Sequence, residues 1–166
     1  MSAGWPATVT DATLGTDTIS GFEGVLGGSA NDVITGSSGA DALGGGLGND
    51  TLRGGAGLDT LEYANASQSL SVDLSLQRTV ATAIGDGQGG TDSVLGFENV
   101  NGGSAGDWLQ GSLDANLLLG NAGNDWLLGA DGNDSLDGGA DADTLDGGIG
   151  QDTLTAGDGN DSVIGG

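Results

Sequence analysis

The sequence contains no cysteine and no histidine, and its only basic side chains are Arg53 and Arg78. The chain therefore offers no thiol nucleophile, no zinc finger and no imidazole for acid–base catalysis. Against the two cations stand 24 acidic residues, which give a formal net charge of -22. A surface this acidic excludes the phosphate contacts that nucleic-acid binding requires. We therefore expect cations as binding partners, and no nucleic acid.

Long apolar runs and aromatic residues are also scarce. No apolar run exceeds three residues, so no segment is long enough to span a bilayer. Aromatic residues make up 4% of the chain, and a chain with so little apolar surface and charge of one sign ordinarily stays disordered. Something must neutralise the carboxylates before the chain can fold.

Glycine is abundant, with 37 residues, and it recurs with a period of nine. One proline and no three-residue period exclude a collagen helix. Eleven nonapeptides in one frame occupy residues 27–62 and 102–164, among them GGLGNDTLR, GGAGLDTLE and GGIGQDTLT. Position one is glycine in ten of the eleven, position six is aspartate in ten, and position eight is Ile, Leu or Val in all.

The repeats predict four segments along the chain. These are a partial leading repeat unit at 1–26, a first nonapeptide block at 27–62, inserted strands with a degenerate repeat at 63–101, and a second nonapeptide block at 102–166. A longer repeat relates residues 15–35 to residues 90–110, and a degenerate nonapeptide accompanies each copy.

The segment 63–101 has patterns of its own. Alternating apolar residues predict a half-buried strand over 70–76, and a second strand is expected at 79–84 with a turn at 85–90. Phe22 and Val25, like Phe97 and Val100, are expected to plug the core beside the degenerate units.

Each position of the nonapeptide has a physical role. Glycines at positions one, two and four allow the left-handed backbone of a tight turn. Residues seven to nine form a minimal strand that buries position eight. The predicted core residues are Ile34, Leu43, Leu52, Leu61, Leu109, Leu118, Leu127, Leu136, Leu145, Leu154 and Val163.

A three-residue strand cannot bury its apolar side alone, so two units should form one coil that stacks in parallel on the next, about 4.8 Å away. Aspartates eighteen residues apart then lie on the same side of adjacent coils. The predicted pairs are Asp32 with Asp50, Asp41 with Asp59, Asp107 with Asp125, Asp125 with Asp143, Asp134 with Asp152 and Asp143 with Asp161, with Asn116 and Asp134 as a weaker seventh.

Stacked carboxylates repel one another unless a divalent ion lies between them. Calcium suits carboxylate and carbonyl oxygens in irregular geometry, whereas zinc prefers nitrogen and sulfur and magnesium a strict octahedron. The candidate ligands for several calcium ions are Asp32, Asp41, Asp50, Asp59, Asp107, Asn116, Asp125, Asp134, Asp143, Asp152 and Asp161, together with Asp17 and Asp92 of the degenerate units.

These nonapeptides resemble the RTX, or haemolysin-type, calcium-binding repeat. The resemblance implies an all-β, right-handed parallel β-roll (a β-solenoid) with calcium between successive turns. It also implies a secreted, extracellular bacterial protein, exported by type I secretion, whose disordered chain folds on meeting calcium. Departures from the pattern occur at the fourth-position residues Ala30, Ala105, Asp114 and Asp141 and at Asn116, where weak or empty sites are expected.

The two tryptophans of the repeats leave two interpretations open. Trp108 and Trp126 both occupy position seven and should stack on an outer face of the roll. Either another segment covers this face, or the face recognises a polysaccharide or a partner, which would make the chain an adhesive module. An exposed sheet edge would also allow end-to-end self-association. The aspartates are committed to regularly spaced turns, so we do not expect an enzyme.

Overall fold

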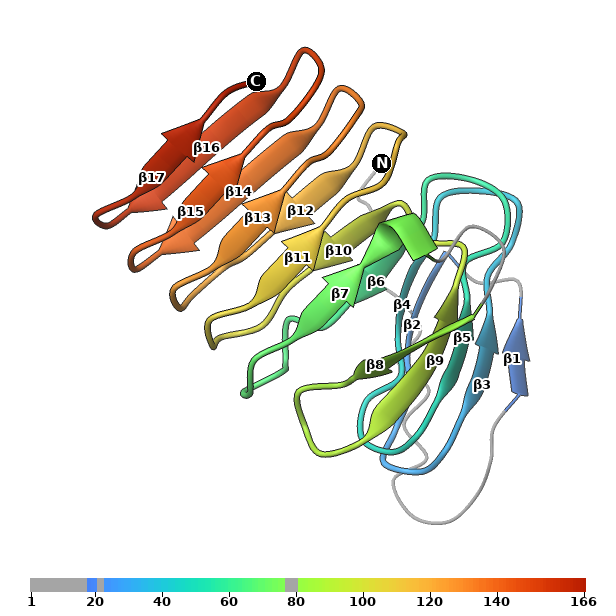
Figure 1. Ribbon diagram of the computed structural model, residues 1–166. Helices are drawn as coiled ribbons and strands as arrows, with labels where there is room; N and C mark the ends of the chain where they lie inside the picture. Colours follow the sequence, from blue (N-terminus) through green and yellow to red (C-terminus); the bar gives the residue numbers. More distant parts are fainter. Residues whose placement is uncertain (1–17, 21–22, 77–80) are drawn as a thin grey trace, which may run out of the picture.

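The structure is a computed structural model, and it describes residues 18–20, 23–76 and 81–166. Within these ranges the chain is all-β apart from one short 3-10 helix, η1 (Leu74–Leu76). The strands stack in parallel as the coils of a β-roll, which confirms the predicted fold class. Figure 1 shows the coils as successive loops from the blue N-terminal block to the red C-terminal block.

One seven-stranded sheet runs through both nonapeptide blocks. Its strands, in spatial order, are β2 (Gly24–Leu26), β4 (Ala42–Gly44), β6 (Thr60–Glu62), β10 (Asn99–Asn101), β12 (Leu117–Leu119), β14 (Ser135–Ala140) and β16 (Thr153–Asp158). β6 pairs directly with β10, with Leu61 opposite Val100. The first block therefore continues into the second without a break on this side.

Two five-stranded sheets form the other side of the roll. The first contains β1 (Thr18–Ser20), β3 (Val33–Thr35), β5 (Thr51–Arg53), β9 (Thr91–Leu95) and β8 (Thr82–Gly85). The second contains β7 (Ser71–Asp73), β11 (Trp108–Gln110), β13 (Trp126–Leu128), β15 (Thr144–Asp146) and β17 (Ser162–Ile164). The insertion thus divides one side of the roll and leaves the other continuous.

The strands bury position eight of the repeat, as predicted. The buried members of the predicted set are Ile34, Leu43, Leu52, Leu61, Leu109, Leu118, Leu127, Leu136 and Leu145, each at most 1% exposed. Leu154 is only partly buried, and Val163 is 48% exposed, so the prediction is wrong for Val163. β17 is the edge strand of its sheet, so no strand of the described ranges pairs with its outer side to cover Val163.

Val25, Phe97 and Val100 are buried, which confirms three of the four predicted core plugs. Phe22 lies outside the described residues. Val94 from β9 completes the core beside them. The apolar core therefore runs through the degenerate unit as well as through the nonapeptides.

The inserted segment departs from the predicted strands. The strand expected at 70–76 ends at Asp73 and gives way to η1, leaving Leu76 57% exposed. The Ser75 backbone N–H donates to Asp73 Oδ1 at 2.9 Å, and this side-chain turn ends the strand. The strand expected at 79–84 begins at Thr82 in the structure, pairs antiparallel with β9 and ends at Gly85; residues 79–80 lie outside the described ranges.

The core predicts a strong contrast between two leucines of one repeat unit. Leu118 is fully buried in the seven-stranded sheet, whereas Leu113 is 66% exposed in the preceding turn. We expect Leu118→Ala to lower the free energy of unfolding by about 2–5 kcal/mol through lost burial and a residual cavity. Leu113→Ala should cost less than about 0.5 kcal/mol. Urea unfolding in the presence of calcium measures both, and equal losses would contradict this assignment of the core.

Candidate metal sites

The position-six aspartates link neighbouring coils through their side chains. In each predicted pair the backbone N–H of the first residue donates to Oδ1 of the residue eighteen positions later. The donor–acceptor distances are 2.7 Å for Asp32–Asp50, 2.9 Å for Asp41–Asp59, 2.7 Å for Asp107–Asp125, 2.8 Å for Asn116–Asp134, 2.8 Å for Asp125–Asp143, 3.0 Å for Asp134–Asp152 and 3.0 Å for Asp143–Asp161. The predicted pairing across coils is therefore confirmed.

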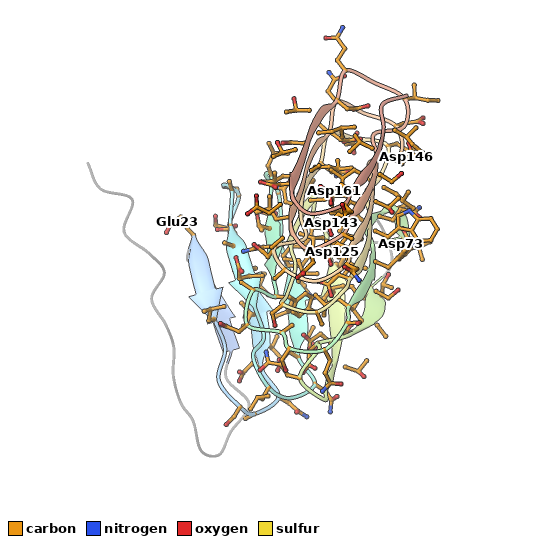
Figure 2. All side chains as sticks on the ribbon, turned by 90° about the vertical axis from the view of Figure 1, so that its left-hand side faces the viewer. Glu23, Asp73, Asp125, Asp143, Asp146 and Asp161 are labelled. Atoms are coloured by element: carbon orange, nitrogen blue, oxygen red, sulfur yellow. The ribbon has the colours of Figure 1, made fainter. Side chains whose placement is uncertain are left out.

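The sheet positions these carboxylates by pairing the residues that follow them. The Thr144 backbone N–H donates to the carbonyl of Asp125, and the Ser162 N–H donates to the carbonyl of Asp143, both at 2.8 Å. Figure 2 shows Asp125, Asp143 and Asp161 grouped along the stack, while Asp73 and Asp146 lie at its outer edge. Stacking the strands thus brings the acidic side chains together in columns.

The second oxygen of these carboxylates is often buried without a hydrogen-bond partner. Among the described repeat aspartates, Oδ2 is buried and lacks a hydrogen-bond partner in Asp50, Asp59, Asp125, Asp134 and Asp143. A buried, unpaired carboxylate oxygen is costly unless a proton or a cation compensates it. These five oxygens are therefore the strongest ligand candidates in the repeats.

The conformation at position two decides whether Oδ2 is left unpaired. In the turns of Asp32, Asp41 and Asp107, the position-two backbone N–H donates to Oδ2 at 3.1, 2.7 and 2.8 Å. In the turns that leave Oδ2 unpaired, position two takes a positive φ instead. These residues are Gly46 (90°), Gly55 (114°), Asn121 (73°), Ala130 (78°) and Gly139 (101°).

Position-one glycines lie close to the unpaired oxygens, where a larger residue would not fit. A Cβ on Gly138 would lie 2.5 Å from Asp143 Oδ2 and 2.6 Å from the carbonyl oxygen of Ala156 in the next coil. A Cβ on Gly129 would likewise meet Asp134 Oδ2 and the carbonyl oxygen of Gly147. A carboxylate and a carbonyl oxygen therefore lie close together beside each of these glycines, and such oxygens are the donors that calcium prefers.

Burial raises the pKa of these carboxyl groups. It brings the pKa of Asp50 and of Asp125 from 3.8 to about 7, and that of Asp134 to about 6. Burial also raises the pKa of Asp59, Asp107 and Asp143. Without a cation, these groups therefore hold protons more tightly than exposed aspartates do.

Asn116 differs from the aspartates in a way that the sequence did not reveal. Its Oδ1 accepts the Ser112 backbone N–H at 2.6 Å, and its amide donates to the Glu98 carbonyl at 2.6 Å. The amide N–H thus bonds directly to a carbonyl oxygen of another coil. A carboxylate oxygen cannot donate to that carbonyl and would need a cation between the two oxygens. This pairing accounts for an asparagine at position six of this unit.

The inserted segment continues the same hydrogen-bonding pattern with other spacings. The Asp50 N–H donates to Asp92 Oδ1, the Asp59 N–H to Glu98 Oε2 and the Leu70 N–H to Asp107 Oδ1, each at 2.9 Å. Asp92 is fully buried, and its Oδ2 accepts the Tyr63 hydroxyl at 3.0 Å. Both oxygens of this predicted ligand are therefore already hydrogen-bonded.

Three further predicted residues and one overlooked residue complete the account. Asp152 and Asp161 receive the N–H groups of the preceding coil but are only partly buried, and Asp17 lies outside the described residues. Sequence reasoning missed Asp86, which is fully buried with Oδ2 unpaired. It lies outside the nonapeptide frame, and its only signal is the surrounding GDGQGG turn.

No group of three or more acidic side chains gathers to hold a metal within the described ranges. The candidate sites therefore depend on carbonyl oxygens beside one or two carboxylates. Their distribution along the turns suits several single ions better than a metal cluster.

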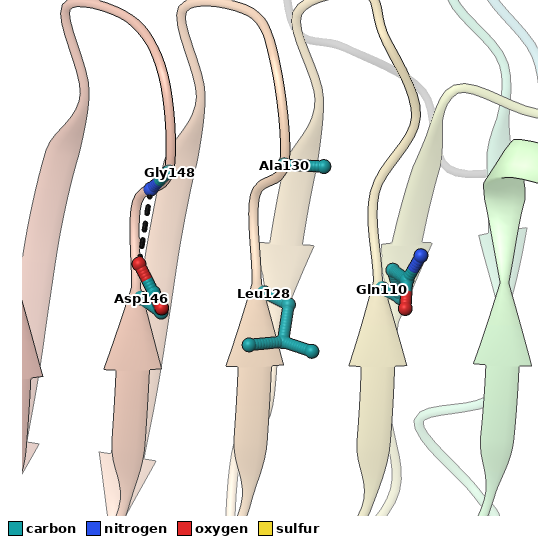
Figure 3. A pocket seen from close by; sticks show the side chains of 5 residues that line it. All are labelled: Gln110, Leu128, Ala130, Asp146 and Gly148. Atoms are coloured by element: carbon teal, nitrogen blue, oxygen red, sulfur yellow. Dashed lines mark hydrogen bonds between the residues drawn. The ribbon is translucent and has the colours of Figure 1, made fainter. Parts of the chain in front are cut away.

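The outer face of the second five-stranded sheet carries the predicted tryptophan pair. Trp108 lies directly opposite Trp126 in the register of β11 and β13, and Trp126 is 53% exposed. A shallow hollow beyond these strands is lined by Gln110, Leu128, Ala130, Asp146 and Gly148 (Figure 3). The Gly148 N–H donates to Asp146 Oδ1 at 3.1 Å, and both residues belong to the lining (Figure 3).

A family model for the RTX calcium-binding nonapeptide repeat matches residues 26–61, 101–136 and 137–166. The chain belongs to this family. RTX repeats form calcium-binding β-rolls and are typically found in secreted proteins. The matched ranges contain every turn with an unpaired position-six oxygen but exclude most of the inserted segment. The RTX chain matched no curated protein, and no described helix is long and apolar enough to cross a membrane.

Removing the charge beside an unpaired oxygen should weaken calcium binding but stabilise the calcium-free fold. Asp125→Asn keeps Oδ1 for the Asp107 N–H but removes the buried charge, so it should weaken calcium binding and stabilise the calcium-free roll. Asp158→Asn, at an exposed carboxylate, should change neither quantity appreciably. Calcium titration measures the first effect, and the β-sheet circular dichroism signal of the calcium-free proteins at pH 5 measures the second. A stabilised calcium-free variant that retains full calcium affinity would contradict the ligand role of Asp125.

The raised pKa values predict the pH dependence of stability. Asp50 and Asp125 have a pKa of about 7 in the calcium-free fold, whereas an unfolded aspartate has one of about 3.9. Between these values the folded chain binds more protons, so its stability should fall as the pH rises from about 4 to 7. Calcium reverses this trend because it needs deprotonated carboxylates. The β-sheet circular dichroism signal at pH 5 and pH 7.5, with and without calcium, reports the folded fraction and tests the crossover, and parallel pH profiles would exclude it.

Proposed function

We propose that the RTX chain is a module that folds and becomes rigid when calcium ions enter the spaces between its turns. The observation that carries this proposal is the row of buried Oδ2 atoms without partners in Asp50, Asp59, Asp125, Asp134 and Asp143. Each lies in a turn whose sequence repeats with the same spacing, so one kind of ligand serves all of them. Calcium is the ion that both the oxygen donors and the family favour.

The net charge supports folding coupled to calcium binding. The chain carries a formal charge of -22, and its acidic groups approach one another as the coils stack. Without cations, self-repulsion and carboxylate burial oppose the compact state. Calcium removes both penalties, so its binding free energy contributes directly to folding.

The side-chain ligands follow from the hydrogen bonding in each turn. Asp50, Asp59, Asp125, Asp134 and Asp143 offer a free buried oxygen, and Asp152 and Asp161 occupy the equivalent place in the last coils. Asp32, Asp41 and Asp107 first have to release a backbone N–H from Oδ2. Asn116 and Asp92 are already satisfied by hydrogen bonds, so we assign them structural roles.

We place this module outside the cell, in a secreted bacterial protein exported by type I secretion. Calcium concentrations there match the affinity of about 10⁻⁴–10⁻³ M expected of extracellular calcium modules. An acidic chain kept unfolded by low calcium before export would fold only after it. The position-six aspartates of the described residues serve the turns and coil contacts, so we assign the module no enzymatic role.

Adhesion is the second candidate, and the exposed Trp126 beside Trp108 favours it. An aromatic surface of this kind suits a polysaccharide or a protein partner. The neighbouring hollow is shallow and includes the charged Asp146. Calcium would act as scaffold in this case, so adhesion adds to the proposed calcium-dependent folding and does not replace it.

Calcium titration tests the main proposal. We expect the calcium-free chain at pH 7.5 to be expanded and to lack a β-sheet circular dichroism signal, and calcium near 10⁻⁴–10⁻³ M to produce a compact β-roll. Small-angle scattering gives the dimensions, and a chelator should reverse the change. Magnesium at the same concentration provides the control for charge screening. A β-sheet signal that is already complete in chelator would overturn calcium-dependent folding.

A further inference from the structure

The loop that follows β8 contains a buried carboxylate outside the repeats. Asp86 is 0% exposed, and it lies in the 62–100 interval between the segments that match the RTX family. Its surroundings come from the turn 86–90, from the turn before Asp50 and from the buried Tyr63. The family pattern assigns no role to this residue.

The loop holds one oxygen of Asp86 tightly. Oδ1 accepts three backbone N–H groups, from Gln88 at 2.7 Å and from Gly89 and Gly90 at 2.9 Å each. Gly87 and Gly89 have positive φ values of 68° and 113°, which allow the loop to wrap around the carboxylate. The side chain is therefore held in one orientation by its own loop.

The other oxygen of Asp86 lies beside the same glycine as a second, carbonyl oxygen. Asp86 Oδ2 is buried and has no hydrogen-bond partner. A Cβ on Gly90 would lie 2.5 Å from Asp86 Oδ2 and would also meet the carbonyl oxygen of Gly48 in the preceding coil. Carboxylate and carbonyl oxygens thus converge here as they do in front of Gly129 and Gly138 in the repeats.

Asp92 explains why a second aspartate is needed in this turn. It occupies position six of the degenerate unit, but its Oδ1 accepts the Asp50 N–H and its Oδ2 accepts the Tyr63 hydroxyl. The regular ligand position therefore offers no unpaired oxygen in this coil. Asp86 supplies one from a different place in the sequence.

No basic side chain neutralises this pair of carboxylates within the described ranges. Arg53 is the basic residue there, and it is exposed on β5. Two buried carboxylates in one turn without a counter-ion favour a cation between coils. The oxygen donors and the absence of nitrogen and sulfur ligands select calcium over zinc.

We propose that the loop 85–90 forms an additional calcium site in which Asp86 Oδ2 and the carbonyl oxygen of Gly48 are ligands. This site rests on the proposed calcium-binding function, and it extends that function to a segment without the nonapeptide pattern. Calcium here joins the end of the first five-stranded sheet to the preceding coil. The inserted segment would then respond to calcium together with the repeats.

Crystals grown with terbium(III), an anomalous scatterer that shares calcium's preference for oxygen, test the site directly. We expect one anomalous peak between Asp86 Oδ2 and the Gly48 carbonyl, in addition to peaks in the repeat turns. Peaks in the repeat turns without one here would overturn this proposal alone. A chain without any peak, and without calcium binding in solution, would overturn the proposed function as well.

The Asp86→Asn variant distinguishes a metal site from a loop held by hydrogen bonds alone. Its amide can donate to the Gly48 carbonyl and its oxygen can still accept the three N–H groups, so the loop keeps its hydrogen bonds. We expect the variant to lose only the peak at the loop. Asp73→Asn, in the same inserted segment but away from this loop, should retain every peak. An unchanged peak in Asp86→Asn would overturn the ligand assignment, and if that variant does not fold, the wild-type map decides.

Discussion

One interaction organises the roll: a position-six carboxylate that reaches across to the coil before it. Through Oδ1 it accepts a backbone N–H eighteen residues earlier, and in five repeat turns Oδ2 is buried without a partner. The leucine column and the parallel strands bring the coils together. That same stacking moves acidic groups out of water and raises the pKa of Asp125 to about 7 through burial. The stacked coils therefore require a cation to compensate these buried carboxylates.

The periodic features could be predicted because a nine-residue period leaves few arrangements. Alternation within a three-residue strand sends position eight inward, and Leu118 and Leu127 are fully buried as expected. Two units per coil place Asp125 beside Asp143, and the structure joins them by a hydrogen bond. The prediction was wrong at Val163, which lies in the edge strand β17, because the repeat pattern carries no information on which strand lies at the edge of a sheet.

The finer details of the site depend on backbone conformation that residue type does not determine. Gly28 donates its N–H to Asp32, whereas Gly46 turns to a φ of 90° and leaves Asp50 with an unpaired oxygen. Ala130 adopts a φ of 78° although its Cβ disfavours it. Asp86 was missed for a related reason: its partners come from the loop around it and from a coil distant in sequence.

The uninterrupted seven-stranded sheet has a mechanical consequence. Because β6 pairs with β10, force applied along the stack has a path between the blocks through backbone hydrogen bonds that bypasses the intervening 36 residues. Additional chain can be accommodated on the opposite side while this spine stays intact. The roll can thus contain an insertion on one side without forming a hinge between the two blocks.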